Sequence, residues 1–178
     1  DAVAGTTISM RILMFSLMPA WGLSAAAATL VGQYMGAEKL KRATLSVLLT
    51  VRYNVIFLAI ITAIYLIFGK TLVFIFTDNQ TVANIAATGL QIIVLGYIFF
   101  AIGMVMIQAF NGAGDTKTPM FINIFVFILL EIPMAYVLAI PLEMGVMGVF
   151  ITIAICHSLH ALIAMYYFRK GNWKSVKV

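Results

Sequence analysis

The sequence predicts an all-α membrane protein, a polytopic bundle of about five transmembrane helices in a single domain, residues 1–178. Composition is the first indication, because 63% of the residues are hydrophobic and 10% are charged, against about 45–50% and about 25% in a soluble domain. The second indication is a series of apolar runs, since about 20 helical residues cross a hydrocarbon core of about 30 Å. Helices are expected because lipid leaves every backbone polar group to be paired within its own segment.

Five apolar runs of this length are separated by short polar breaks. The expected spans are about residues 8–34, 44–68, 84–109, 120–140 and 145–168. The first contains Pro19, which should kink it, and ends on Gly32 and Gly36, whose spacing permits close helix packing. The break after the second span includes the apolar sequence LVFIF. This stretch is too short to cross a bilayer, so we interpret it as an interfacial segment.

The loop FNGAGDTKTP separates the third span from the fourth. Gly112 and Gly114 should supply positive-φ positions that end one helix. Asp115 or Thr116 can cap the next helix, and Pro119 suits its first turn. The pattern is typical of a tight turn, in which Lys117 adds positive charge.

The basic residues favour one side of this arrangement. Arg11 and Lys70 fall on one side of the five spans, and the other side holds Lys39, Lys41, Arg42, Lys117, Arg169, Lys170, Lys174 and Lys177. The positive-inside rule assigns the richer side to the cytoplasm. Residues 169–178 would then be a cytoplasmic basic tail with Trp173 as an interfacial anchor. This topology, with anionic lipid, accounts for the net charge of +5 without a nucleic-acid partner.

The chain is expected to be a piece of a longer protein. It begins DAVAGTT, without methionine or a signal peptide. An odd number of spans also prevents the two symmetric halves from which many transporters are built. The single cysteine, Cys156, excludes an internal disulfide.

Glu131 is the acidic residue that falls near the middle of a span, where a carboxylate costs about 2.5–3.5 kcal/mol. Pro133 cannot donate to the carbonyl of Leu129, so the helix should kink there and leave an acceptor free. A carboxyl beside a free carbonyl can bind H⁺ or Na⁺. The alternative is a protonated Glu131 that hydrogen-bonds to a neighbouring helix and supports packing.

Other polar residues in the spans give weaker signals. His157 and His160 lie on one face of the last span. No third ligand stands at a recognisable spacing, so no metal site is predicted. We expect interhelical hydrogen bonds, with a proton relay as the alternative. Arg52 is expected to snorkel toward the cytoplasmic face, with substrate contact as the alternative.

Several polar stretches resemble, in order, the carboxy-terminal lobe of multidrug and toxic compound extrusion (MATE) transporters: ATLVGQYMGAEKLKRA, LVFIFTDNQTVANIAATGLQI, QAFNGAGDTKTPMFIN, EIPMAYVLA and FRKGNWK. The resemblance covers nearly the whole chain. It implies helices eight to twelve of a twelve-helix, two-lobe fold, whose amino-terminal lobe and helix seven would be the missing partner.

The resemblance implies a secondary active antiporter. Such a protein exports amphipathic, often cationic compounds in exchange for H⁺ or Na⁺ by alternating access. It would be a multi-pass protein of the cell membrane, here the inner membrane of a bacterium, with a cytoplasmic carboxy terminus and no cofactor beyond the coupling ion. The loop would lie at the cytoplasmic gate, a role for Gly112, Gly114, Asp115, Lys117 and Pro119.

Site residues follow from the same reasoning. Glu131 is the candidate for cation coupling. Many family members carry an acid in the third span, where this chain reads YIFFAIGM; the alternative is that coupling belongs to the missing lobe. Aromatic, methionine and amide side chains suit a deformable substrate cavity; the candidates are Tyr97, Phe99, Phe100, Met104, Gln108, Asn123 and Tyr136.

Two alternatives remain open. A lipid-linked oligosaccharide flippase of the same superfamily would need a strongly cationic cavity, to which this chain offers Arg52. A non-transporting scaffold subunit is the second. The sequence contains no P-loop, nucleophile elbow or metal-ligand spacing, so an enzyme is not predicted.

Overall fold

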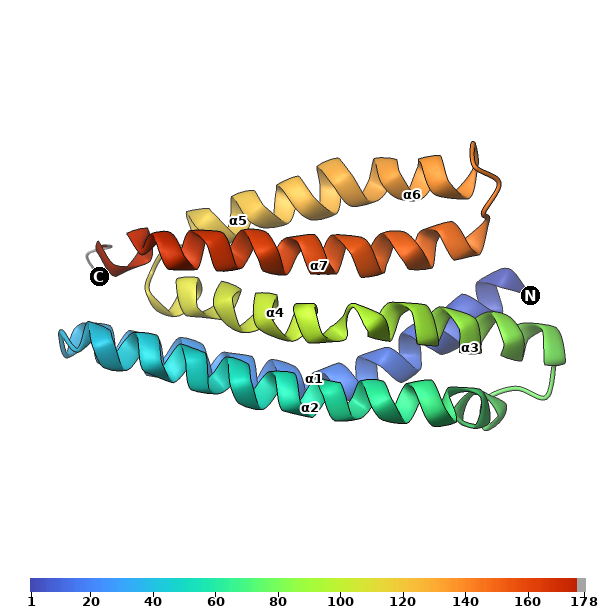
Figure 1. The fold of residues 1–178 in the computed structure, drawn as a ribbon, viewed down its shortest axis with the longest axis horizontal. Coiled ribbons are helices and arrows are strands. Elements are labelled where there is room, and N and C mark those ends of the chain that lie inside the picture. The colour runs from blue at the N-terminus through green and yellow to red at the C-terminus, as the bar shows by residue number, and fades with distance from the viewer. Residues whose placement is uncertain (176–178) are drawn as a thin grey trace.

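The computed structural model describes residues 1–175, and in this part of the chain every regular element is a helix. The elements, in order, are α1 (Ala2–Gly36), α2 (Leu40–Phe74), α3 (Gln80–Leu95), α4 (Tyr97–Gly112), α5 (Lys117–Asn123), the π-helical segment η1 (Ile124–Glu131), α6 (Ile132–Ala139), α7 (Val146–Lys170) and a 3₁₀ turn η2 (Asn172–Ser175). Figure 1 shows α1 and α2 at one edge of the bundle, the α5–α6 stretch at the other, and α4 and α7 between them.

The helices have the lengths that a bilayer requires. Within residues 1–175, four helical stretches are long and apolar enough to cross a membrane, and a fifth if α3 and α4 form one bent span. These are the five apolar runs of the sequence, so the chain is an all-α, multi-pass membrane protein. Helix α4 lies at its centre, in contact with α1, α2 and α7, whereas the α5–α6 stretch packs mainly against α7.

The third span is not the continuous helix that the sequence predicts. Helices α3 and α4 meet at Gly96 with a bend of 56°. A Cβ on Gly96 would lie 3.0 Å from the carbonyl oxygen and 3.2 Å from the Cα of Ala154, so α7 approaches the break closely. The hydroxyl of Thr62 donates to the carbonyl of Val94 at 3.2 Å. A side chain from α2 therefore supplies a partner to a carbonyl next to the bend.

The first three residues of LVFIF continue helix α2 and do not form the separate segment that the sequence predicts. Helix α2 continues to Phe74, and Val73 is buried in the core. Ile75 and Phe76 follow the helix and are exposed. Asn79 then caps α3, where its side-chain oxygen accepts from the backbone N–H groups of Thr81 and Val82. Burial of Val73 against other helices is a tertiary effect that the length of an apolar run cannot indicate.

The fourth span runs without interruption from Lys117 to Ala139. The sequence predicts a kink next to Glu131, and the structure places there a π-helical segment, Ile124–Glu131, which ends two residues before Pro133. Proline lacks an N–H and its ring crowds the carbonyl four residues earlier. A wider turn, with bonds five residues apart, is one way for a helix to accommodate it.

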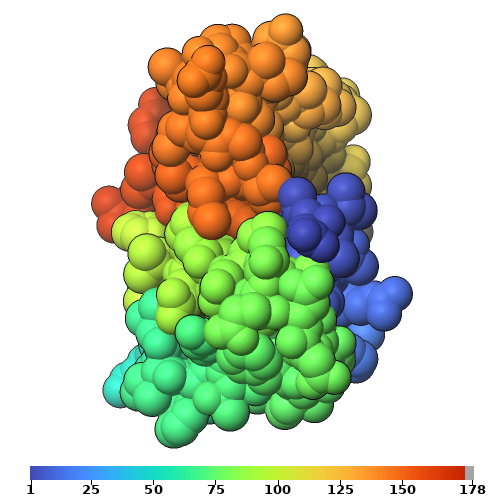
Figure 2. Space-filling view, turned by 90° about the vertical axis from the view of Figure 1, so that its right-hand side faces the viewer, coloured from blue at the N-terminus to red at the C-terminus, as the bar shows by residue number. Residues whose placement is uncertain are grey.

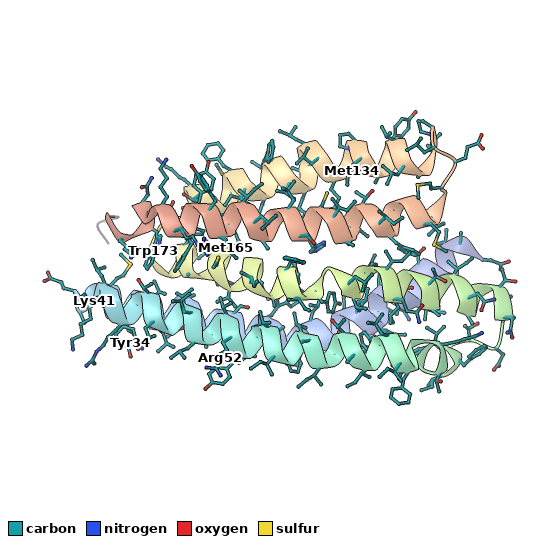
Figure 3. The ribbon with its side chains drawn as sticks, viewed as in Figure 1. Tyr34, Lys41, Arg52, Met134, Met165 and Trp173 are labelled. Atoms are coloured by element: carbon teal, nitrogen blue, oxygen red, sulfur yellow. The ribbon has the colours of Figure 1, made fainter. Side chains whose placement is uncertain are left out.

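The cations gather at one end of the bundle. Figure 1 shows the α1–α2 turn, the α4–α5 loop and the end of α7 at that end, and Figure 3 labels Lys41 and Trp173 there. Figure 2 shows the opposite end, where the N-terminal residues lie beside the α6–α7 connection and the start of α3. The described residues therefore confirm the predicted grouping of the basic side chains at one end; Lys177 lies outside them.

Trp173 differs from the expectation of an interfacial anchor. It is 0% exposed. Its ring stacks on Phe168 with 5.0 Å between centroids, and its Nε1 donates to the carbonyl of Phe168 at 3.1 Å. Gly171, with φ +80°, turns the chain back so that the indole packs against α7 rather than facing the headgroups.

Candidate functional site: a polar and aromatic cluster between α4, η1 and α7

Polar and aromatic side chains from four elements meet inside the bundle. We call Phe100, Asn123, Phe127, His157 and His160 the histidine cluster. The two histidines lie on one face of α7 because they are three residues apart. Asn123 and Phe127 stand four apart on the α5–η1 stretch, and Phe100 belongs to α4. A long apolar helix thus presents its few polar groups to its neighbours rather than to lipid.

His160 makes the interhelical hydrogen bond of this cluster. Its Nε2 lies 3.0 Å from Oδ1 of Asn123, and because a carbonyl oxygen can only accept, Nε2 carries the proton. The other ring nitrogen, Nδ1, is buried without a hydrogen-bond partner in the described chain. A Cβ on Gly103 would lie 2.9 Å from this atom. Gly103 therefore provides the room that the imidazole occupies against α4.

His157 is held by its own helix. Its Nδ1 donates to the carbonyl of Ile153 at 2.7 Å, which leaves Nε2 with a lone pair. Phe100 packs against the imidazole with 4.5 Å between centroids in a T-shaped arrangement, and Phe127 lies 5.7 Å away. The predicted interhelical hydrogen bond is therefore confirmed for His160 and wrong for His157, whose ring instead makes aromatic contacts.

Glu131 is the last residue of η1, the element that also carries Phe127. The side chain is half-buried, and its Oε2 is buried without a hydrogen-bond partner among residues 1–175. Cys156 on α7 is also buried. An interior carboxyl oxygen without a partner is costly in a membrane protein. Such an oxygen has free capacity to bind a proton or a cation.

The seven residues predicted to line a cavity divide into four groups. Phe100 and Asn123 belong to the histidine cluster. Tyr97 and Met104 are buried in the core, where the Tyr97 hydroxyl donates to the carbonyl of Leu13 on α1 at 3.4 Å. Gln108 accepts from Asn111, and the remaining two candidates, Phe99 and Tyr136, are exposed. The structure thus brings two of the seven together with the helix that carries Glu131.

The FNGAGDTKTP loop is a tight turn, with one correction. Gly114 has φ +81°, as predicted. Gly112 does not, because it is the last residue of α4 and its role is close contact with Ala28 of α1. Asp115 caps the following helix, its two carboxyl oxygens accepting from the backbone N–H and the hydroxyl of Thr118 at 3.1 and 2.6 Å. Pro119 is buried and Lys117 exposed.

Sequence reasoning missed Asn54. This side chain is 0% exposed and lies between α1, α2 and α4, where its Nδ2 donates to Ser24 Oγ at 3.4 Å and to the carbonyl of Ala101 at 3.3 Å. Its Oδ1 is buried without a partner in the described residues. The signal was present, since an amide in the middle of the apolar run VRYNVIFLA meets the same criterion as Glu131.

Two further groups contribute little to this site. Arg52 is exposed on α2. Among residues 1–175, no three His, Cys, Asp or Glu side chains converge in a way that would hold a metal ion. The chemistry that the cluster offers is therefore hydrogen bonding and reversible protonation.

Comparison with known proteins identifies the fold and the family. A family model described as MatE matches residues 1–137. A probable multidrug resistance protein NorM of Thermotoga maritima is 29% identical over 178 residues, which cover 98% of this chain and 38% of that protein. Multidrug and toxin extrusion protein 1 of Homo sapiens is 28% identical over 163 residues, 89% of this chain and 28% of that protein.

Solved structures give the same fold. A multidrug resistance MATE family transporter in its outward-facing conformation superposes with a TM-score of 0.89 at 20% identity, over 98% of this chain and 40% of that one. The inward-facing conformation of a MATE family transporter gives 0.84 at 19% identity, over 96% and 40%. The chain thus spans 28% to 40% of the length of these proteins. Since the family model covers most of its residues, the chain belongs to the MatE family.

Proposed function

We propose that this chain forms the carboxy-terminal lobe of a secondary active antiporter that exports amphipathic, often cationic compounds in exchange for H⁺ or Na⁺. Membership of the MatE family and relatives named as multidrug resistance and extrusion proteins support this proposal. The missing partner would be an amino-terminal lobe together with helix seven, and the substrate path would run between the two lobes.

One observation carries the assignment of a coupling residue: the Glu131 carboxyl, inside an apolar span, has a buried oxygen without a hydrogen-bond partner in the described chain. Structural polar groups in membrane helices are normally hydrogen-bonded, because lipid supplies no partner. An unpaired carboxyl oxygen is therefore more in keeping with a group that exchanges a cation during a transport cycle.

The surrounding backbone favours such an exchange. Glu131 stands at the end of a π-helical segment and two residues before Pro133. π-helical segments are frequent at functional sites, because they alter the regular hydrogen bonding of the helix. A change between π- and α-helical turns would rotate the Glu131 side chain relative to α7. That rotation would connect cation binding to a movement of the α5–α6 stretch.

The substrate would meet the deformable apolar side chains of this lobe. Phe100 and Phe127 are partly buried and place aromatic rings against the two imidazoles. Aromatic faces attract organic cations with about 0.5–2 kcal/mol per good contact. Tyr97, Phe99, Met104, Gln108 and Tyr136 remain candidates for parts of the path that the other lobe would complete.

The orientation follows from the cation distribution. The end that carries the α1–α2 turn, the α4–α5 loop and the end of α7 would face the cytoplasm. The FNGAGDTKTP turn would then lie at the cytoplasmic gate, and the membrane would be the inner membrane of a bacterium. The flippase alternative finds less support, because Arg52 is exposed on α2 rather than inside the bundle.

Transport in inside-out vesicles tests the proposal. The full-length protein that contains this chain is assayed for dye efflux, with the pH gradient and the sodium gradient collapsed separately. We expect one gradient to drive transport and Glu131→Gln to abolish it, because an amide cannot carry the exchanged cation. The matched control is Glu143→Gln in the exposed α6–α7 turn, which should transport like the parent.

The outcomes separate the alternatives. Full transport by Glu131→Gln would move coupling to the other lobe and leave Glu131 with a packing role. Absence of dye movement under either gradient would favour the flippase or the scaffold subunit. Dye efflux that continues at the same rate when both gradients are collapsed would exclude coupling to H⁺ or Na⁺.

A further inference from the structure

A long apolar groove runs on the outer side of the α5–α7 pair. Its volume is about 760 Å³, within the range of about 300–1,000 Å³ that ligand pockets occupy. One wall comes from α5 and η1 and the other from α7; the side chains that matter here are Phe121, Phe125 and Leu129, and Leu162, Tyr166 and Tyr167. In the bilayer such a groove must be filled by hydrocarbon or by protein.

The groove is separate from the histidine cluster. On α7 the cluster uses His157 and His160, whereas the groove uses Leu162, Tyr166 and Tyr167, which are exposed. On the other helix Asn123 and Phe127 point to the cluster and Phe121 and Phe125 to the groove. The contact between the two helices thus has an inner polar flank and an outer apolar one.

Basic side chains stand at one end of this groove. Lys117 lies one helical turn before Phe121 on the same face of its helix. Lys170 follows Tyr166 by four residues and Tyr167 by three, so it lies above both rings. Lys117, Arg169 and Lys170 are exposed. The nearby acid, Asp115, keeps its negative charge while it accepts hydrogen bonds from Thr118, but three cations against one carboxylate leave the end of the groove positive.

The rest of the helix pair carries no lysine or arginine. Between residues 120 and 168 the sequence contains no lysine or arginine, and its acids are Glu131 and Glu143. The groove is therefore apolar along its length and positive at the end where a headgroup would lie. Tyrosine side chains at that level are typical of the membrane interface. Long lysine side chains can reach a phosphate at the surface while their stems lie along the apolar wall.

We propose that this groove binds an anionic phospholipid. The acyl chain lies against Phe121, Phe125 and Leu129, and the phosphate stands at the level of Lys117 and Lys170. Charge complementarity favours the anionic lipid over a zwitterionic one. Both lipids carry a phosphate that the lysines attract, but the zwitterionic headgroup also brings a cation close to the lysines. The site is independent of transport and of the coupling ion.

Fluorescence quenching in vesicles tests this site on the full-length protein. Phe125→Trp places a reporter on the groove wall. Its quenching is measured as the difference from the protein without the substitution, with either phosphatidylglycerol or phosphatidylcholine brominated on its acyl chains and at equal mole fraction. We expect brominated phosphatidylglycerol to quench the reporter several-fold more strongly than brominated phosphatidylcholine.

Removal of the two lysine charges tests whether the lipid preference arises at the groove. Lys117→Gln combined with Lys170→Gln should make the two lipids quench equally, because the positive end is lost. The matched control, Lys39→Gln with Lys41→Gln, removes two exposed cations from the α1–α2 turn at the same end of the bundle and should leave the preference unchanged.

Three results would overturn the proposal. Equal quenching of the Phe125→Trp reporter by both lipids, with Lys117 and Lys170 present, would mean ordinary contact with the bilayer. No quenching by either lipid would mean that another part of the full-length protein covers the groove. Equal loss of preference in the control pair would assign the effect to the general charge of that end.

Discussion

Gly112 of α4 lies in backbone contact with Ala28 of α1. A Cβ built on Gly112 would stand 2.7 Å from the Cα of Ala28 and closer still to its carbonyl oxygen. From the other side, a Cβ on Gly32 would lie 3.2 Å from the carbonyl oxygen of Gly112. The first glycine of the FNGAGDTKTP sequence therefore sets how closely two long helices cross.

Replacement of Gly112 by alanine should separate these helices. The added methyl meets backbone, which cannot rotate away, and overpacking of this kind costs typically about 1–3 kcal/mol. We expect Gly112→Ala to lower the melting temperature by several degrees, measured by gel filtration after heating in detergent. Gly36→Ala is the control, because Gly36 ends α1 with no heavy atom within 4 Å of its added Cβ. Equal stability of the two variants would show that the crossing has room for a side chain.

Glu131 gives opposite predictions for stability and for transport. Its unpaired, buried oxygen costs about 1–3 kcal/mol when the desolvation is complete, and somewhat less for a half-buried side chain. Glu131→Leu keeps the size and removes that cost. We therefore expect a higher melting temperature together with loss of dye efflux. A lower melting temperature would indicate that the carboxyl makes a stabilising hydrogen bond.

The hydrogen bond between His160 and Asn123 can be measured by a double-mutant cycle. Such bonds in membrane proteins contribute about 0.6 kcal/mol on average and up to about 1.7. Unfolding free energies of His160→Ala, Asn123→Ala and the double variant should give a coupling of this size. The cycle of His157→Ala with Asn123→Ala is the control and should be additive, because His157 bonds within its own helix. Additive effects in the cycle of His160 and Asn123 would contradict the hydrogen bond between these two side chains.

Trp173 should be shielded from both water and lipid. It is 0% exposed and stacks on Phe168, whereas Trp21 is 50% exposed. In a Trp21→Phe variant we expect a blue-shifted emission that neither iodide nor brominated lipid quenches. In a Trp173→Phe variant, where Trp21 remains, brominated lipid should quench strongly. Strong quenching of Trp173 by lipid would restore its interpretation as an interfacial anchor.

The spans could be predicted because a bilayer imposes length and polarity on each helix separately. Apolar runs of sufficient length and short polar breaks located α1, α2, α7 and the 117–139 helix, and the basic residues correctly grouped the connections by end. The role of Asp115 as a helix cap could also be predicted from the sequence, because capping depends on residues that are close in sequence.

The break at Gly96 and the packing role of Gly112 could not be read in this way. A glycine in an apolar run is compatible with an uninterrupted helix, a turn or a close contact, and the neighbour decides among them. At Gly96 that neighbour is Ala154, and at Gly112 it is Ala28. Both belong to helices distant in sequence.

The candidate site likewise has features that one helix determines and features that depend on contacts between helices. The sequence by itself determined that the chain is a bundle of membrane-spanning helices, that Glu131 is an acid within a span and that His157 and His160 share a face, because these properties follow from composition and from the repeat of one helix. Only the tertiary structure decided that His160 meets Asn123, that His157 packs on Phe100, and that one oxygen of Glu131 and one of Asn54 lack partners in the described residues. Hydrogen bonding across helices depends on how each helix is rotated against its neighbours, and that rotation is set by the packing of many apolar side chains together.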